Sequence, residues 1–70
     1  MGDSVYKFIE IVGTSKTSWE EAATNAVKAA GKTLRDLRVA EVVQQDLVIE
    51  KNKVKAFRTK MMVSFKFEGS

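Results

Sequence analysis

The segment VKAFRTKMMVSFKFE, Val54 to Glu68, decides the fold, because apolar and polar residues alternate along most of it. Successive side chains of a β-strand point to opposite faces. One face of this segment carries large apolar side chains: Phe57, Met61, Val63, Phe65 and Phe67. The other face carries mostly polar ones: Arg58, Lys60, Ser64 and Lys66, with Ala56 and Met62. The pattern predicts a strand with one face against a core.

The residues before this strand predict its partner. Residues 38–49 are rich in Val, Leu and Ile, and the polar stretch EKNK, Glu50 to Lys53, separates them from Val54. Strands joined by so short a connection pair in antiparallel fashion. We therefore expect a long antiparallel hairpin.

A helix is predicted upstream, in TSWEEAATNAVKAAGKTL, residues 17–34. Its apolar residues recur at helical spacing and form one stripe, mostly of alanine: Trp19, Ala22, Ala23, Ala26, Val27, Ala30 and Leu34. Ser18 and Glu21 have capping-box spacing, with the hydroxyl accepting from the Glu21 amide and the Glu21 carboxylate reaching back. The small side chains allow the helix to lie close to a sheet. It ends at Gly31 or continues to about Leu34.

The first segment, VYKFIEIV at Val5 to Val12, is β-branched and aromatic and predicts a strand that ends before Gly13. It is apolar on both faces apart from Lys7 and Glu10, which indicates a central or interface strand. The fold class is then α+β in the order β-α-β-β: a three-stranded antiparallel sheet partly wrapped around one helix, in a single domain, 1–70. One helix cannot cover such long strands, so we expect other subunits to cover the remaining apolar residues.

Composition excludes several function classes. The 70-residue chain has no Cys and no His, so it lacks disulfides, thiolate and imidazole metal ligands, and the usual general base near neutral pH. We do not expect an enzyme. No apolar run approaches the roughly 20 residues of a membrane span, and the N-terminal residues lack a secretory pattern. A cytoplasmic protein without a membrane partner is the simplest expectation.

The charge distribution leaves two interpretations open. The formal net charge is +3, and basic side chains recur between residues 51 and 66. Such a stripe could attract phosphates or nucleic acid. The alternative, which we favour, is a solvated strand face whose charges oppose edge-to-edge aggregation, with no nucleic-acid partner.

Asp46 and Glu50 are the acidic residues that suggest a metal site. They are four residues apart on the same expected strand and should face the same side. Carboxylates with backbone carbonyls suit a hard ion such as Ca²⁺, although no EF-hand spacing is present. Solvated charge is the alternative explanation.

The stretches VYKFIEIVGTS, TLRDLRVAEV and VSFKFE, with the alanine-rich helix between the first two, resemble the dodecin family over nearly the whole chain. The resemblance implies a hollow homododecamer. Flavin-binding dodecins carry Trp in a run like LRWFEV at the start of the second strand, and a Gln on the third strand. Pairs of riboflavin or FMN molecules are stacked between such tryptophans at two-fold interfaces.

This chain departs from that run, because it reads LRVAEV. Val39 stands at the Trp position, Ala40 at the Phe position and Arg58 at the Gln position. Val39 has no aromatic face on which a flavin can stack, so the resemblance implies a degenerate flavin site. The alternative is a flavin-sequestering dodecin with an altered pocket, in which Arg58 and neighbouring strand residues replace the aromatic clamp.

The segments GTSKTSWEEAA and RVAEVVQQD are more similar to the divergent calcium-dodecin branch. This similarity implies bound calcium. From the residues themselves, Asp46 is the first candidate ligand, because the amide oxygens of Gln44 and Gln45 lie beside it, and Glu50 is the second. Some members of the family bind coenzyme A near three-fold contacts, and by analogy Lys66 is a phosphate partner. We therefore expect a non-enzymatic protein that binds or stores a small ligand or an ion.

Overall fold

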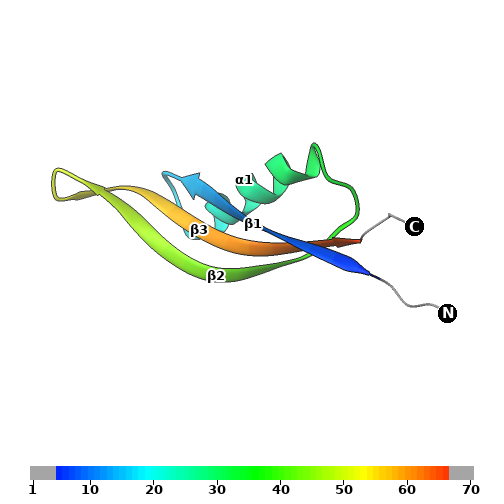
Figure 1. Cartoon of the computed structure of the whole chain (residues 1–70). Helices are drawn as coiled ribbons and strands as arrows, with labels where there is room; N and C mark the ends of the chain where they lie inside the picture. The colour runs from blue at the N-terminus through cyan, green and yellow to red at the C-terminus, as the bar shows by residue number, and fades with distance from the viewer. Residues whose placement is uncertain (1–4, 67–70) are drawn as a thin grey trace.

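The computed structural model describes residues 5–66 and has the predicted β-α-β-β order (Figure 1). The elements are β1 (Tyr6–Ser15), α1 (Trp19–Gly31), β2 (Leu37–Glu50) and β3 (Lys53–Lys66). The α+β class, with one antiparallel sheet and one helix, is confirmed. Phe67, expected on the apolar face of the last strand, lies outside the described residues.

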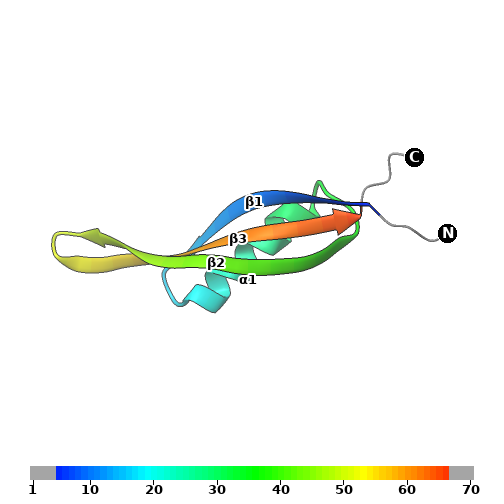
Figure 2. The same cartoon turned by 60° about the horizontal axis from the view of Figure 1, so that its bottom comes forward.

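The sheet has the strand order β1-β3-β2, and both pairings are antiparallel (Figure 2). β3 is therefore the central strand. Of the two places expected for the first strand, central or at an interface, the strand order excludes the central one, and the interface stays a prediction. One edge of β3 pairs with β2 in the tight hairpin, so β1 pairs with the other edge. On the face of the sheet away from α1, the large apolar side chains of β1 are exposed: Tyr6, Phe8 and Val12.

The predicted polar connection is a two-residue turn. Lys51 and Asn52 have φ angles of 53° and 63°, and Glu50 pairs with Lys53 across the turn. Positive φ at both central residues matches the right-handed twist of the two strands. Asn adopts this conformation readily, whereas Lys does so rarely, so the tight geometry of the hairpin fixes the backbone at Lys51.

The start of α1 confirms one half of the predicted capping box. The Ser18 hydroxyl accepts from the Glu21 amide at 3.0 Å. The Glu21 carboxylate does not reach back to the Ser18 amide but accepts from the hydroxyl of Ser15. The Ser18 amide also points to that hydroxyl, at 3.4 Å. Ser15 is buried at the end of β1 and takes the place expected for Glu21, and the helix ends at Gly31, the shorter of the two expected ends.

Gly13 brings the helix close to the sheet. A Cβ atom at Gly13 would lie 2.0 Å from the carbonyl oxygen of Ala22 and 2.8 Å from the Cβ of Ala26. The helix backbone therefore occupies the space that a side chain at Gly13 would fill. The small alanine side chains of α1 allow this close approach. Gly13 and the two residues after it keep pairing with β3, so β1 continues to Ser15 instead of ending at Val12 as expected.

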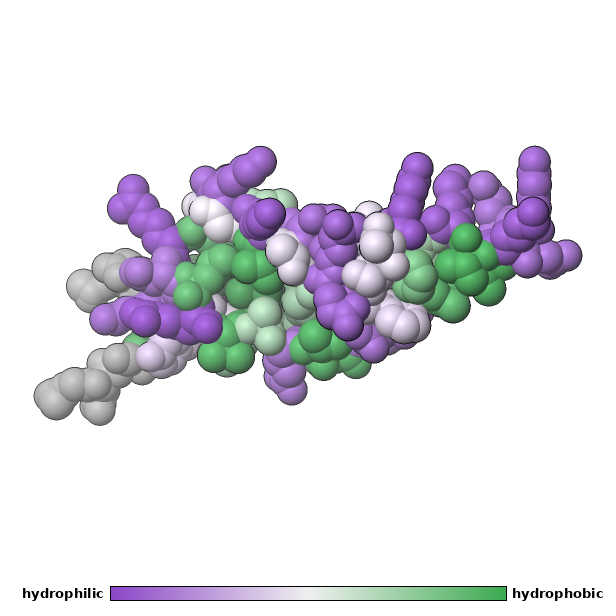
Figure 3. All heavy atoms as spheres, turned by 180° about the vertical axis from the view of Figure 1, so that it is seen from behind, coloured by the Kyte–Doolittle hydropathy of each residue, from purple (hydrophilic) through white to green (hydrophobic). Residues whose placement is uncertain are grey.

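The core lies between α1, β1 and β3, and its largest buried apolar side chains are Met61 and Val63. β1 ends at Ser15, which pairs with Phe57, so the residues of β3 before Phe57 have no partner on β1. Residues 48–56 continue beyond this point as a two-stranded hairpin arm, which extends from the body in Figure 1. Figure 3 shows hydrophobic surface exposed on the arm beside hydrophilic side chains. Apolar residues are thus left uncovered in one chain, as expected.

Candidate functional site

Val39 lies on the face of the sheet opposite α1, which we call the uncovered face. It is 63% exposed and stands in one cross-strand row with Ser64 of β3 and Phe8 of β1. The Ser64 hydroxyl accepts from the Val39 amide at 3.2 Å. Ala40 pairs with the core residue Val63 and so faces the helix side. The two residues that depart from the flavin-binding run therefore lie on opposite faces of β2.

Val39 and Arg58 do not meet within one chain. Val39 is opposite Ser64, whereas Arg58 lies six residues away along β3, about 20 Å at the rise of a strand. Val39 offers an aliphatic side chain where stacking needs a ring. Within one chain, these two positions therefore do not form a common site.

Asp46 and Arg58 form the best-defined polar contact of the sheet. The two residues are opposite each other on β2 and β3. The Arg58 Nε donates to Asp46 Oδ1 and its Nη2 to Oδ2, both at 2.7 Å. These hydrogen bonds and the charges of Arg58 and Lys60 lower the pKa of Asp46, although burial opposes them. The carboxylate is ionised at neutral pH, and both its oxygens accept from the guanidinium.

Trp19 holds the same part of β2 from the other side of the sheet. Its Nε1 donates to the backbone oxygen of Asp46 at 3.1 Å. Its ring packs edge-on against Phe57, with the ring centroids 5.2 Å apart. The buried hydroxyl of Thr59 donates to the Trp19 carbonyl at 2.9 Å. The first residue of α1 is thus fixed to the hairpin, a contact that the helical spacing of Trp19 did not indicate.

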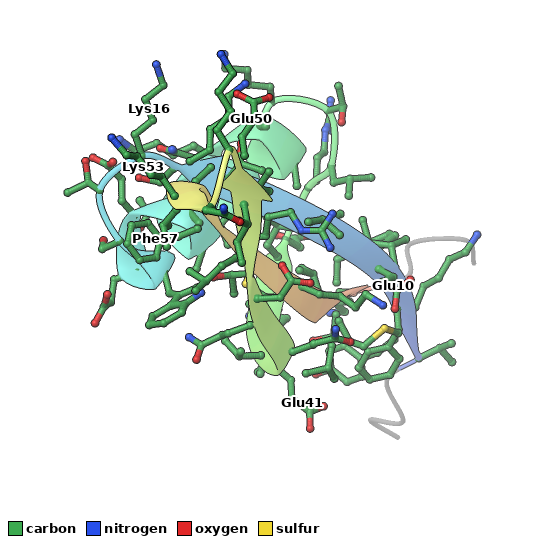
Figure 4. All side chains as sticks on the ribbon, turned by 90° about the vertical axis from the view of Figure 1, so that its left-hand side faces the viewer. Glu10, Lys16, Glu41, Glu50, Lys53 and Phe57 are labelled. Atoms are coloured by element: carbon green, nitrogen blue, oxygen red, sulfur yellow. The ribbon has the colours of Figure 1, made fainter. Side chains whose placement is uncertain are left out.

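Glu50 lies at the other end of the hairpin arm and pairs with Lys55 at 3.2 Å. Asp46 and Glu50 thus contact different basic residues, Arg58 and Lys55. Glu41 is another acidic residue of β2, and Figure 4 shows that Glu41 and Glu50 point in opposite directions, so these two carboxylates do not converge. Residues 5–66 contain no group of three or more acidic, His or Cys side chains that could hold a metal ion. Calcium takes 6–8 oxygen ligands, so the described part of one chain does not fit it.

Acidic partners face much of the basic stripe. Besides the Arg58 and Lys55 pairs, Lys60 lies 3.9 Å from Glu10 of β1. These pairs support the interpretation of a solvated strand face whose charges are balanced locally. Lys66 is exposed at the end of β3, opposite Tyr6, and its backbone amide donates to the Asp36 carbonyl at 3.2 Å. Its role as a phosphate partner stays a prediction.

The described residues include no helix with the length and apolar character needed to span a membrane.

Comparison with known proteins places this geometry in a family. A model of the dodecin family matches residues 5–68. The calcium dodecin of Mycobacterium tuberculosis is 49% identical over 63 residues, which cover 90% of this chain and 89% of the relative. The dodecin of Thermus thermophilus is 39% identical over 64 residues, 91% of this chain and 93% of the relative.

Two solved structures are similar over nearly the whole chain. Dodecin from Streptomyces coelicolor matches with a TM-score of 0.93 at 36% identity, covering 100% of both chains. The crystal structure of M. tuberculosis calcium dodecin, described as having a novel calcium-binding site, matches with a TM-score of 0.84 at 48% identity, covering 96% of both chains. The predicted resemblance is confirmed: the chain belongs to the dodecin family.

Proposed function

We propose that this chain forms a homododecameric, non-enzymatic protein that binds or stores a small ligand or ion, and that its flavin site is degenerate. The observation that carries the proposal is Val39, an exposed aliphatic residue on the uncovered face at the position of the family's Trp. A flavin ring gains most of its contact by stacking, for which Val39 has no ring. Arg58, at the position of the Gln, is engaged by Asp46.

The exposed apolar residues of one chain support assembly. Those on the uncovered face and the hairpin arm include Phe8, Val39, Ile49 and Val54. Apolar surface of this extent is typical of contacts between subunits. Light scattering should give a mass about twelve times the 7.8 kDa of the chain. A monomer or dimer mass would refute the proposed shell.

A flavin titration on protein of known assembly mass tests the degenerate site. We expect riboflavin and FMN to keep their fluorescence at micromolar protein, because Val39 cannot stack on them. The double variant Val39→Trp, Arg58→Gln should gain affinity and quench the flavin. Saturable quenching by the unmodified protein would instead support the flavin-sequestering alternative.

Calcium is the ion that we propose for this assembly. The support is the 49% identity to a calcium dodecin and the ionised carboxylate of Asp46 on β2. Since residues 5–66 of one chain do not fit calcium, its ligands would come from more than one chain. Glu50 is the second proposed ligand, and its greater exposure and distance from Trp19 make it the less constrained of the two.

Calcium affinity, measured by calorimetry on chelator-treated protein, tests these ligands. Asp46→Asn should weaken binding. Arg58→Gln should strengthen it, because the guanidinium competes for both Asp46 oxygens. Lys55→Gln tests the second proposed ligand in the same way, since it removes an equal charge beside Glu50. If Lys55→Gln raises the affinity and Arg58→Gln does not, Glu50 replaces Asp46 as the ligand.

A further inference from the structure

A groove runs between α1 and β2 on the helix side of the sheet. Its volume is about 300 Å³, at the lower end of the range for small-molecule sites. The helix contributes one wall, β2 the other, and Met61 of β3 the floor. The residues that line it are Ala23, Thr24, Val27, Lys28, Ala40, Val42 and Met61.

The position of the helix explains why the groove is open. The close approach at Gly13 holds α1 against β1, and the helix packs mainly on β1 and β3. The helix side of β2 is left without cover, so Val42 is 50% exposed although it pairs with the buried Met61. Ala23 and Ala40 are too small to close the space between the two walls. The groove therefore follows from the sequence of the helix stripe and of β2.

The chemistry of the lining is asymmetric. The lining atoms are mostly apolar, and Lys28 is the single charged residue among them. Within residues 5–66, Lys28 makes no ion pair. The Thr24 hydroxyl donates to the Glu20 carbonyl at 3.0 Å, which leaves its oxygen free to accept but not to donate. A ligand that matches this groove has an apolar body and a negative group near Lys28.

We infer that the groove binds a small amphiphile with an apolar chain and an anionic head, such as a medium-chain carboxylate. The chain lies between the alanine and valine side chains, and the carboxylate pairs with the Lys28 ammonium. Burial of the chain supplies most of the affinity, at about 25 cal/mol per Å² of apolar surface. The exposed ion pair contributes less and selects the head group. This inference rests on the proposed small-ligand binding, because it names a ligand class and a site for it.

The test is calorimetric titration of the assembled protein with decanoate, and with decanol as the uncharged probe. We expect saturable decanoate binding that is tighter than decanol binding. Lys28→Gln should reduce decanoate affinity to the decanol level and leave decanol unchanged. Lys16→Gln is the matched control, because Lys16 is an exposed lysine that points away from the body in Figure 4 and does not line the groove.

Ala40→Phe tests the groove itself, since the added ring fills the space between the walls. It should abolish binding of both probes in a variant whose assembly mass is unchanged. Equal decanoate affinity in Lys28→Gln and the unmodified protein would overturn the inference. So would the absence of saturable binding, which would mean that another copy fills the groove. These tests use neither flavin nor calcium, so failure of the groove proposal leaves the flavin and calcium proposals to be decided by their own titrations.

Discussion

β2 and β3 run through both the body of the sheet and the hairpin arm, yet large apolar side chains are buried only in the body. In the body, Met61 and Val63 are 1% exposed, whereas in the arm Ile49 is 64% and Val54 is 51% exposed. In the body, α1 and β1 pack around Met61 and Val63, whereas within residues 5–66 the arm has neither a third strand nor a helix over it. Alternation of residue type predicts which side of a strand is apolar, but the length of the neighbouring elements decides what covers it.

The contact between Gly13 and the helix is the feature whose loss should disturb the body most. Gly13→Val should destabilise the protein by about 3 kcal/mol or more, because the new side chain would meet the backbone of α1 at Ala22. Chemical denaturation at a fixed protein concentration measures the free energy of unfolding.

Gly31→Ala is the matched control for this prediction. A Cβ atom there would lie 3.8 Å from Leu37 Cδ1, an ordinary contact, at the end of the helix. Removing a helical glycine should stabilise the protein by up to about 1 kcal/mol. Similar losses in both variants would mean that glycine content, not the close approach of α1 to β1, determines the effect.

Met61→Ala should lower the free energy of unfolding by about 2–3 kcal/mol, since it removes a fully buried side chain from the core. The loss should be similar at every protein concentration, because Met61 belongs to the core of a single chain. Denaturation series at several concentrations measure it. A loss that disappeared at high concentration would indicate that contacts between copies, not the core of the body, hold Met61.

Ile49→Ser is the corresponding change in the arm, and we expect the opposite dependence. Ile49 contacts little in one chain, so the fold of the body should persist. If copies cover the arm, the assembly should dissociate at higher protein concentration than the unmodified protein does. Light scattering over a dilution series measures the change, with circular dichroism to confirm the fold. An unchanged mass profile would place the arm outside the subunit contacts.

Sequence reasoning predicted features that depend on neighbouring residues. The alternation of β3, the Ser18 cap and a polar turn within Glu50 to Lys53 all follow from local chemistry. The order of the strands was left open, because an apolar first strand suits an interface as well as a central place, and the structure excludes only the central place. The capping role of Ser15 was also not predicted. Its hydroxyl accepts from the Ser18 amide, where the Glu21 carboxylate was expected.

The register of the hairpin shows why the polar contacts were harder to predict. An uninterrupted ladder from the Lys51–Asn52 turn would place Asp46 opposite Phe57. The irregularity between Val48 and Ile49 leaves Lys55 unpaired and moves Arg58 opposite Asp46. No residue type marks this bulge in the sequence. The ion pair, and with it the competition for the proposed calcium ligand, therefore became visible only in three dimensions.

The Asp46–Arg58 pair should give the smallest effect, because both side chains are partly exposed and salt screens them. The pKa of Asp46 is lowered in the folded chain, so the pair stabilises the fold above the ordinary carboxyl pKa of about 3.9. That stabilisation is lost as the pH falls through the lowered value. Asp46→Asn should therefore be less stable than the unmodified protein near neutral pH, and the difference should vanish in acid.

Denaturation at several pH values and two salt concentrations measures this difference. High salt should reduce it near neutral pH. Glu50→Gln is the control, since the Glu50–Lys55 contact is more exposed and should contribute less. A deficit in Asp46→Asn that persisted in acid would have another origin. It would arise from the backbone at Asp46, whose oxygen accepts from Trp19, and would show that the strand position rather than the charge of Asp46 stabilises the fold.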